Sequence, residues 1–463
     1  MHEGRNRDVP AKSELPWGDI LNYNKLLNKF KLSEAERKQN DSIIKSVLEK
    51  VAFIIKDMKL DASPVLVGSS ARGTSLKNSD IDIFIQFSKN LDNQQMERYG
   101  LEIGFRVIPD GKAKYAEHPY VSGLINNVKV DIVPCYRMKI GERTRSSVDR
   151  TPLHTEFLNS VMDEKDREQA IILKLFLKRI GVYGSELKTG GFSGYVSELC
   201  IYYHKTFENF LKFVNETRNQ LVIGPNSSDF NTPVVLIDPV DDRRNAASAV
   251  SEKSLSILRI SSAMYLKNPD PGFIDLDNDL DKEVKDYDRK TYMIILELKR
   301  PDIIDDILFP QIELFKRNLM AFAQRMDFHF MNAHSSVNSS TIQVLLELES
   351  GTLPALKIHE GPPADNPNAL RFYEKYLHDQ EVVRGPFVKN DRIYVEIQRK
   401  DTNFKIALEK NISKLNLGHN LNSYKGKIKM YTSKKKILSS MAYREFMSIR
   451  EPPDLSAGEN LKE

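Results

Sequence analysis

Two aspartates, Asp80 and Asp82, lie two positions apart in a segment that continues through Ile85 with alternating apolar side chains. Successive side chains of a β-strand point to opposite faces, so we expect both carboxylates on one face while Ile81, Ile83 and Ile85 point into a core. Two such carboxylates can hold a magnesium ion, which prefers oxygen ligands. This arrangement suggests the chemistry of nucleotidyl transfer.

A turn of small residues precedes the aspartates. Gly68 and Ser69 follow a short apolar strand expected at 63–67. Glycine lets backbone N–H groups approach a phosphate closely, and serine adds a hydroxyl. A second alternating run at 128–134 supplies a third aspartate, Asp131. We expect the carboxylates and this phosphate cradle to face each other.

Three carboxylates are enough protein ligands for the two metal ions that activate a 3′-hydroxyl and stabilise a pyrophosphate leaving group. Asp80 and Asp82 are expected to contact both ions. Asp131 is expected chiefly to hold the ion near the hydroxyl and to accept the hydroxyl proton. Two aspartates at this spacing are also common in surface loops, so the prediction depends on the Gly-Ser turn and on Asp131 as well.

Length and composition indicate a modular soluble protein. The chain has 463 residues, of which 40% are hydrophobic and 29% charged, and about three domains are expected at this length. Cys135 and Cys200 are far apart in the sequence and support neither a disulfide framework nor a cysteine zinc site. No run is apolar for long enough to cross a bilayer, and the first ten residues lack the apolar core of a secretion signal. We therefore expect a cytoplasmic protein with no membrane partner.

The periodicity of apolar residues predicts both helices and strands. Ser33 and Glu36 form a capping box ahead of a long helix. The middle of the chain is expected to be mainly helical and the C-terminal part to mix both types, so the predicted fold class is α+β and multidomain. The other expected helices are 165–180, 195–214, 312–322 and 368–378, and the expected C-terminal strands are 292–298, 342–348 and 392–397.

Charge is unevenly distributed along the chain. The net charge is +4 overall, but residues 381–450 contain 16 Lys and Arg against 6 Asp and Glu, a local net charge of +10. Basic residues interleaved with aromatic ones suit a phosphate backbone and stacked bases. A solvated sheet surface with core aromatics is the alternative. The aromatic residues concerned are Phe387, Tyr394, Phe404, Tyr424 and Tyr431.

Two other kinds of site are not supported by the sequence. Asp275, Asp277 and Asp279 imitate the start of a calcium loop, but Leu280 occupies the position of the required glycine and Asp286 that of the required glutamate. An acidic linker at 270–288 is the prediction there. The chain also lacks a Walker-type phosphate loop.

The run GSSARGTSLKNSDIDIFI resembles the active-site signature of the nucleotidyltransferase superfamily, which includes the poly(A) polymerases. Four further segments resemble stretches of class I, archaeal-type CCA-adding enzymes. They are AEHPYVSG from Ala116, TPLHTEF from Thr151, LKLFLKRIGVYGSELKTGGFSGY from Leu173 and DPVDDRRNAA from Asp238. The resemblance covers nearly the whole chain. It implies a nucleotidyltransferase head at 1–150, a mainly helical nucleotide-binding neck at 151–268, and an α+β body and tail at 269–463 that bind tRNA.

In activity, the resemblance implies template-independent addition of C, C and A to the 3′ end of tRNA. The substrates would be CTP and ATP, the cofactor Mg²⁺, and the by-product pyrophosphate; a homodimer is left open. One alternative is a poly(A) or oligoadenylate-forming enzyme with the same carboxylates, and another is a catalytically silent RNA-binding relative. Product length and use of CTP separate these alternatives.

The resemblance also assigns roles to individual residues. Ser69 and Arg72 would contact the nucleotide triphosphate, and the three aspartates would be the metal carboxylates, in agreement with the strand pattern. His154, Lys174 and Tyr183 match positions that grip the triphosphate and ribose, and Arg244 matches an arginine that contacts the incoming base.

The last four of these residues, His154 to Arg244, could each have an ordinary structural role instead. His154 could cap a helix, and Lys174 could belong to a solvated helix face. Tyr183 could be a core residue with its hydroxyl at the surface. Arg244 could form a local salt bridge with a neighbouring aspartate.

Overall fold

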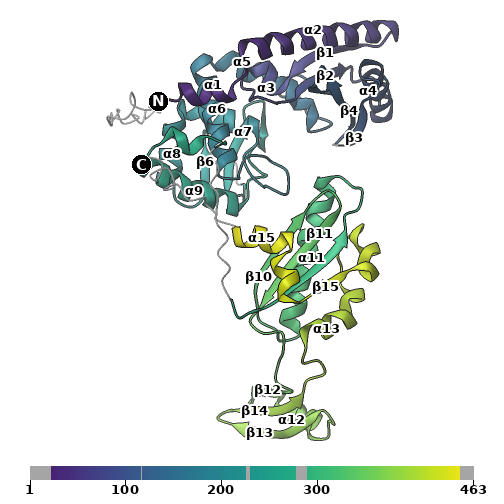
Figure 1. Cartoon of the computed structure of the whole chain (residues 1–463), viewed down its shortest axis with the longest axis vertical. Helices are drawn as coiled ribbons and strands as arrows, with labels where there is room; N and C mark the ends of the chain where they lie inside the picture. The colour runs from purple at the N-terminus through teal and green to yellow at the C-terminus, as the bar shows by residue number, and fades with distance from the viewer. Residues whose placement is uncertain (1–21, 116, 226–229, 278–288, 449–463) are drawn as a thin grey trace, which may run out of the picture. The chain divides into compact units, whose positions relative to one another are not determined.

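The computed structural model describes residues 22–115, 117–225, 230–277 and 289–448. These residues divide into two compact units, 22–277 and 289–448, whose elements are labelled in Figure 1. Both units combine helices with sheets, which confirms the predicted α+β, multidomain class. In the part of the chain that the structure describes, no helix is long and apolar enough to span a membrane.

The first unit begins with a mixed five-stranded sheet. Its strand order is β1-β2-β5-β4-β3, in which β2 and β5 are parallel and the other neighbours antiparallel. The central strands β2 and β5 are those predicted from the aspartate segments. The bounds are β1 Ala62–Val67, β2 Ile81–Phe87, β3 Lys112–Tyr115, β4 Pro119–Ile125 and β5 Val128–Tyr136.

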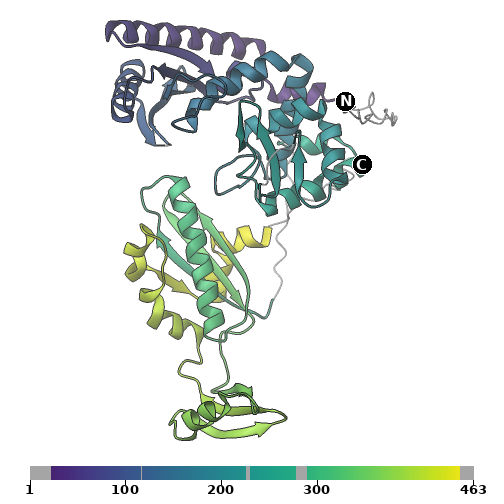
Figure 2. The same ribbon diagram turned by 180° about the vertical axis from the view of Figure 1, so that it is seen from behind.

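Two helices cover one face of this sheet. Helix α2 (Glu34–Asp57) starts at the predicted Ser33–Glu36 capping box, and helix α4 (Asn93–Val107) follows β2. Both helices bury apolar side chains against the isoleucines of β2, which are fully buried as the alternating pattern predicts. Figure 2 shows α2 and the sheet from behind. Because one face of β2 is committed to this core, its aspartates must lie on the other face.

A mostly helical layer completes the first unit around a second hydrophobic core. It also contains a small sheet of order β6-β7-β8, which the sequence pattern did not predict. The helices are α1 Asn24–Phe30, α3 Gly68–Arg72, α5 Thr151–Val161, α6 Glu164–Arg179, α7 Gly194–His204, α8 Phe207–Glu216, α9 Glu252–Lys267 and α10 Pro271–Ile274; the strands are β6 Leu221–Ile223, β7 Val234–Asp238 and β8 Asp241–Asn245.

The prediction of one helix over 195–214 is wrong. Lys205 adopts a φ of 66°, which ends α7, and Thr206 caps a new helix by accepting a hydrogen bond from the backbone N–H of Asn209. Apolar residues continue at helical spacing through the break, so periodicity alone did not reveal it. The helix predicted at 165–180 is confirmed as α6, and Gly181 follows it with a φ of 75°.

Part of the predicted acidic linker is folded. Phe273 and Ile274 of α10 are buried in the second core, which lies within the first unit, although the predicted third domain begins at residue 269. Asp275 and Asp277 both pair with Lys29 of α1, at 2.6 and 2.9 Å. Asp279, Leu280 and Asp286 lie outside the described residues.

The second unit contains a four-stranded sheet of order β10-β11-β9-β15 and a three-stranded sheet of order β12-β14-β13. Helix α11 covers one face of the larger sheet, and α14 and α15 cover the other. The three predicted C-terminal strands are confirmed as β9, β11 and β14. The bounds are β9 Tyr292–Lys299, α11 Asp305–Arg325, β10 Phe330–Val337, β11 Thr341–Leu348, β12 Leu356–Pro363, α12 Ala369–Leu377, β13 Val382–Lys389, β14 Arg392–Gln398, α13 Phe404–Asn411, β15 Lys429–Tyr431, α14 Lys434–Leu438 and α15 Met441–Ser448.

Candidate active site

Three aspartates meet on the face of the first sheet that α2 and α4 leave uncovered. Asp82 of β2 is directly opposite Asp131 of β5 in the parallel register, and Asp80 immediately precedes β2. Asp131 is 8% exposed and accepts a hydrogen bond of 2.5 Å from the hydroxyl of Ser122 on β4. The sequence-predicted carboxylates are therefore brought together by strand pairing.

A lysine that the sequence reasoning did not single out neutralises part of this charge. The Lys129 ammonium pairs with Asp80 and lies 3.5 Å from Asp131. Lys129 precedes Asp131 by two positions on the same strand, so both side chains point to the same face. Three carboxylates and one ammonium leave a formal charge of −2 at the site.

The remaining carboxylates repel one another. Burial first, and then the charges of Asp131 and Asp80, raise the pKa of Asp82 to about 7. In the described residues, no three Asp, Glu, His or Cys side chains already converge at metal-binding geometry. The chemistry of the donor set nevertheless fits a divalent cation, because it consists of hard oxygen donors with an excess of negative charge.

The backbone of the Gly-Ser turn approaches these carboxylates closely. Gly68 has a φ of 75°, and a Cβ atom placed on it would lie 2.2 Å from Oδ2 of Asp82. Glycine is required here for both reasons. Ser69 follows in the short helix α3, and its hydroxyl accepts a hydrogen bond of 3.2 Å from the Ser75 hydroxyl.

A buried charge cluster lies beside the turn. Arg72, at the end of α3, donates from Nε to Glu198 of α7 at 2.6 Å. Lys174 of α6 donates to the other oxygen of Glu198 at 2.7 Å and to the Thr74 hydroxyl at 2.9 Å. Glu198 is fully buried and Lys174 is 2% exposed. The cluster therefore connects the end of α3 and Thr74 to the adjacent helices α6 and α7.

The cluster holds two cations and one carboxylate, so its formal charge is +1. Burial lowers the pKa of Lys174, whereas its two cationic partners lower the pKa of Glu198 to about 2 despite burial. Buried charge of one sign is costly without a counter-charge. The excess positive charge is consistent with the predicted role of Arg72 at a triphosphate. Lys174 belongs to a buried network, and the alternative of a solvated helix face is wrong.

A second polar cluster converges on Asp238, at the end of β7. Its carboxylate accepts from Nε2 of His154 at 2.8 Å, from the Tyr195 hydroxyl at 2.9 Å and from Nη1 of Arg244 at 2.7 Å. The rings of His154 and Tyr195 stack with centroids 3.8 Å apart. His154 and Arg244, predicted separately from distant segments, are thus joined by one fully buried carboxylate. Arg244 does form a local ion pair, and this pair also connects it to His154.

Arg72 links the two clusters to the aspartates. Its Nη1 lies 3.3 Å from the hydroxyl of Thr155, the neighbour of His154. Its charge lowers the pKa values of His154 and Asp82, although burial remains the dominant influence on both. Arg72 therefore contacts both Glu198 and the neighbour of His154, and its charge also reaches Asp82.

An open basic pocket of about 680 Å³ extends from Arg244. Arg143, Arg150 and Arg243 also line it, and Asp241 pairs with Arg150 at 3.0 Å and with Arg243 at 3.2 Å. Four arginines against one carboxylate favour an anionic ligand, and the planar guanidinium suits phosphate in particular.

Tyr183 is placed close to the Glu198 cluster. Its hydroxyl is the nearest atom to a Cβ placed on Gly194, at 3.0 Å, and the ammonium of Lys178 lies 5.1 Å from its ring centroid. Burial and the charge of Glu198 raise the pKa of Tyr183 to about 12. Its hydroxyl is therefore protonated at neutral pH and can donate a hydrogen bond.

Four residues of this region were missed by the sequence reasoning: Lys129, Tyr195, Glu198 and Asp238. Lys129 could have been found, because it shares the strand face of Asp131. The others each have at least one partner more than 40 positions away, such as Tyr195 with Asp238 and Glu198 with Arg72, and no local pattern signals such contacts.

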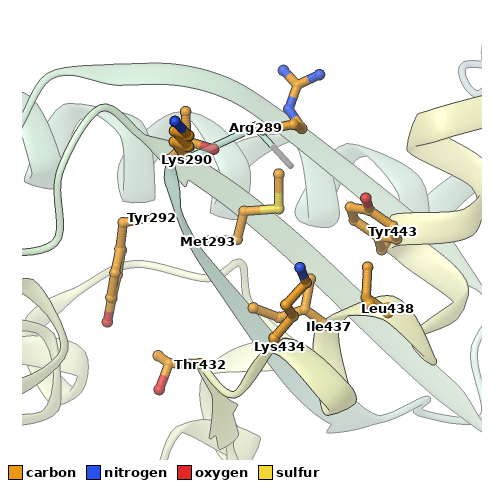
Figure 3. Close-up of a pocket in the computed structure, with 10 residues that line it drawn as sticks. Arg289, Lys290, Tyr292, Met293, Thr432, Lys434, Ile437, Leu438 and Tyr443 are labelled. Carbon is orange, nitrogen blue, oxygen red and sulfur yellow. The ribbon is translucent and has the colours of Figure 1, made fainter. Parts of the chain in front are cut away.

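The second unit carries a smaller basic pocket of about 180 Å³ between β9 and α14 (Figure 3). Figure 3 shows Met293 of β9 near Lys434, Ile437 and Leu438 of α14. Lys434, Lys435 and Lys436 are exposed, so this part of the basic segment is accessible to a polyanion.

The aromatic residues of the basic segment do not form one stacking surface. Phe404 is fully buried in the core beneath α11, so its proposed stacking on a base is wrong. Tyr424 and Tyr431 pack, half-buried, against cores of the second unit. Phe387 and Tyr394 face each other across β13 and β14 with ring centroids 6.0 Å apart.

Comparison with known proteins identifies the family. Three family models match: a nucleotidyltransferase domain at residues 44–154, the second domain of tRNA nucleotidyltransferase at 168–275, and the C-terminal domain of CCA-adding enzymes at 289–431. The CCA-adding enzyme of Thermoplasma volcanium is 42% identical over 89% of this chain and 93% of its own length. Those of Picrophilus torridus and Thermoplasma acidophilum are 40% and 38% identical over 89% and 88% of this chain, and over 95% and 93% of their own lengths. The chain therefore belongs to the archaeal CCA-adding enzyme family of tRNA nucleotidyltransferases.

Proposed function

We propose that this protein adds C, C and A to the 3′ end of tRNA from CTP and ATP, without a nucleic-acid template and with release of pyrophosphate. The observation that carries the proposal is the register that pairs Asp82 with Asp131 beside the Gly68 turn, in a chain with CCA-adding relatives. The proposed division of labour is a catalytic head at 1–150, a nucleotide-binding neck at 151–268 and a tRNA-binding body and tail at 269–463. A cytoplasmic location and a homodimer remain predictions.

The three aspartates are the proposed holders of two Mg²⁺ ions. Asp80 and Asp82 would contact both ions, and Asp131 would hold chiefly the ion beside the attacking hydroxyl. Bound there, the ions would supply charge stabilisation for the attacking and leaving oxygens. Their binding would also lower the pKa of Asp82, because a cation favours the ionised carboxylate.

Residues around the turn are the proposed triphosphate grip. Ser69 offers a hydroxyl, and Arg72 and Lys174 belong to a cluster with excess positive charge. Fixed cations next to the phosphates would orient the α-phosphate toward the RNA hydroxyl and stabilise the charge that develops on pyrophosphate. The Tyr183 hydroxyl, which is protonated at neutral pH, would donate a hydrogen bond on the same side.

The polar cluster around Asp238 is the proposed site for the sugar and base. His154 would contact the ribose, and Arg244 would contact the incoming base with the N–H groups that Asp238 does not occupy. The arginine-lined pocket beside Arg244 would accept phosphates, either of the nucleotide or of the RNA end.

The proposal is tested by giving the purified chain, with Mg²⁺, a tRNA that lacks its CCA end, together with labelled CTP, ATP, UTP or GTP. Products are resolved to single nucleotides. Growth by three residues, with incorporation of C and A alone, supports the proposal. A long tail of A alone would indicate a poly(A) polymerase, and no growth on any RNA would indicate a silent RNA-binding relative.

A further inference from the structure

Asp238 is the common acceptor for groups from three separate elements. His154 comes from α5, Tyr195 from α7 and Arg244 from β8, and none of the three donors is a sequence neighbour of another. Asp238 also accepts from the backbone N–H of Val240 at 3.1 Å. Four donors thus occupy a carboxylate that is itself fully buried. Because all four hydrogen bonds go to one buried carboxylate, the donor groups are held in a single arrangement.

The charge state of the cluster follows from its contacts. Burial raises the pKa of Asp238, but the hydrogen bonds from His154, from the backbone N–H of Val240 and from Arg244 outweigh burial and hold this pKa below its usual value, so Asp238 is ionised at neutral pH. Burial lowers the pKa of His154, and Arg244 and Arg72 act in the same direction, while Asp238 opposes them. The lowered pKa favours the neutral imidazole of His154.

The tautomer of His154 is determined by this partner. An ionised carboxylate can only accept, so Nε2 of His154 must carry the proton in its 2.8 Å contact with Asp238. A neutral imidazole has one proton, and Nδ1 is then an acceptor. No described residue donates a hydrogen bond to Nδ1. The ligand group that suits this atom is a hydroxyl, since a phosphate oxygen has no proton to donate.

We propose that Asp238 is a positioning residue for nucleotide selection: it holds Nδ1 of His154 ready to accept a ribose hydroxyl and fixes Arg244 to contact the base. This inference rests on the proposed function. Tyr195 supports the arrangement by donating to the same carboxylate and by stacking on the imidazole. Selection of ribose and selection of base are then linked through one residue that need not touch either.

The linkage predicts a distinctive pattern among three substitutions in the full chain. His154→Gln should reduce the preference for CTP over dCTP while leaving the preference for CTP over UTP. Arg244→Gln should do the reverse. Asp238→Asn should reduce both preferences by about tenfold, mainly through KM, because a neutral amide cannot accept from all the donors. The measurements are KM and kcat for each nucleotide on a tRNA lacking CCA.

Asp166→Asn is the matched control. Asp166 is also a buried carboxylate of the first unit, and it pairs with Lys205 at 3.4 Å without contacting His154 or Arg244. It should leave the preference for CTP over dCTP unchanged. An Asp238→Asn variant that keeps both preferences, or loses them only in parallel with the control, would overturn the proposal.

The tautomer provides a second test that needs neither nucleotide nor activity. The ¹⁵N resonances of His154 in the wild-type chain should show a protonated Nε2 and an unprotonated Nδ1 at neutral pH, and this pattern should change in Asp238→Asn. A protonated Nδ1 in the wild type would overturn the proposal even if Asp238→Asn fails to fold. Failure of the chain to add CCA, with the predicted tautomer present, would instead count against the proposed function alone.

Discussion

Asp82 and Asp131 occupy opposite positions on the one parallel strand pair of the five-stranded sheet. The chain between them, including α4, β3 and β4, makes the crossover that a parallel pair requires. Isoleucines adjacent to Asp82 are buried on the other face. A shift of one residue in this pairing would bury the carboxylates and expose the core, so the register of the sheet and the geometry of the site are fixed together.

Asp82→Ala should abolish nucleotide addition while leaving tRNA binding intact. The substitution removes a carboxylate from the proposed metal site but changes no basic surface, so we expect addition to fall by on the order of a thousandfold. Single-turnover addition and filter binding measure the two effects. Asp110→Ala, at an exposed position in the same unit, is the control. Equal loss of tRNA binding in Asp82→Ala would contradict the assignment.

Gly68→Ala should impair activity more than its backbone cost explains. Gly68 and Gly141 both have positive φ, 75° and 83°, so alanine should cost roughly 1–2 kcal/mol of stability at either position. A Cβ on Gly68 would strike Asp82, whereas one on Gly141 meets no atom within 4 Å. We therefore expect similar melting temperatures for the two variants but a large loss of nucleotide addition in Gly68→Ala alone. Equal activities would count against the close approach of turn and carboxylate.

Glu198→Gln should destabilise the first unit and change its response to acid. The substitution removes the carboxylate that pairs with two buried cations, which should lower the free energy of unfolding by about 3–5 kcal/mol. The pKa of Glu198 is lowered from 4.5 to about 2 on folding, so the stability it contributes is present above about pH 4.5 and is lost as the pH falls toward 2. Chemical unfolding between pH 7 and 3 measures this. The free energy of unfolding of the variant should decline less toward acid pH than that of the wild type. An identical decline in both proteins would exclude Glu198 as a source of the acid sensitivity.

Charge reversal at Lys434, Lys435 and Lys436 should weaken tRNA binding and flatten its dependence on salt. Each phosphate contact that is lost reduces the salt slope by roughly one unit. The matched control reverses the exposed lysines Lys45 and Lys56 on α2. Binding isotherms from low to moderate salt compare the salt dependence of tRNA binding in the triple variant and in the α2 control. An unchanged slope in the triple variant would exclude this basic segment as an RNA contact.

The sequence was sufficient to predict the carboxylate site. Asp80 and Asp82 could be placed on one face because strand alternation is a local property, and the apolar residues between them identified the buried face. Asp131 followed from a second alternating run. The same reasoning predicted α2 and α6, whose capping and periodicity are also local.

The neck could not be predicted in the same way. Glu198 contacts Arg72, and Asp238 contacts His154, from far along the chain, so these contacts depend on tertiary packing. The break at Lys205 is caused by a single positive φ inside a continuous apolar pattern. Phe404 lies in a basic segment but is buried. The composition of the segment could not predict this burial, because composition does not determine which side of α13 faces the core.

The order of addition is the most direct test of the proposed activity. Three forms of one tRNA, ending before CCA, after the first C and after the second C, are each given ATP alone, CTP alone or both with Mg²⁺ in a single turnover. We predict that CTP alone adds two C residues to the first form and one to the second, and that ATP alone adds a single A to the third form and none to the first. Repeated addition of A to every form would contradict the account.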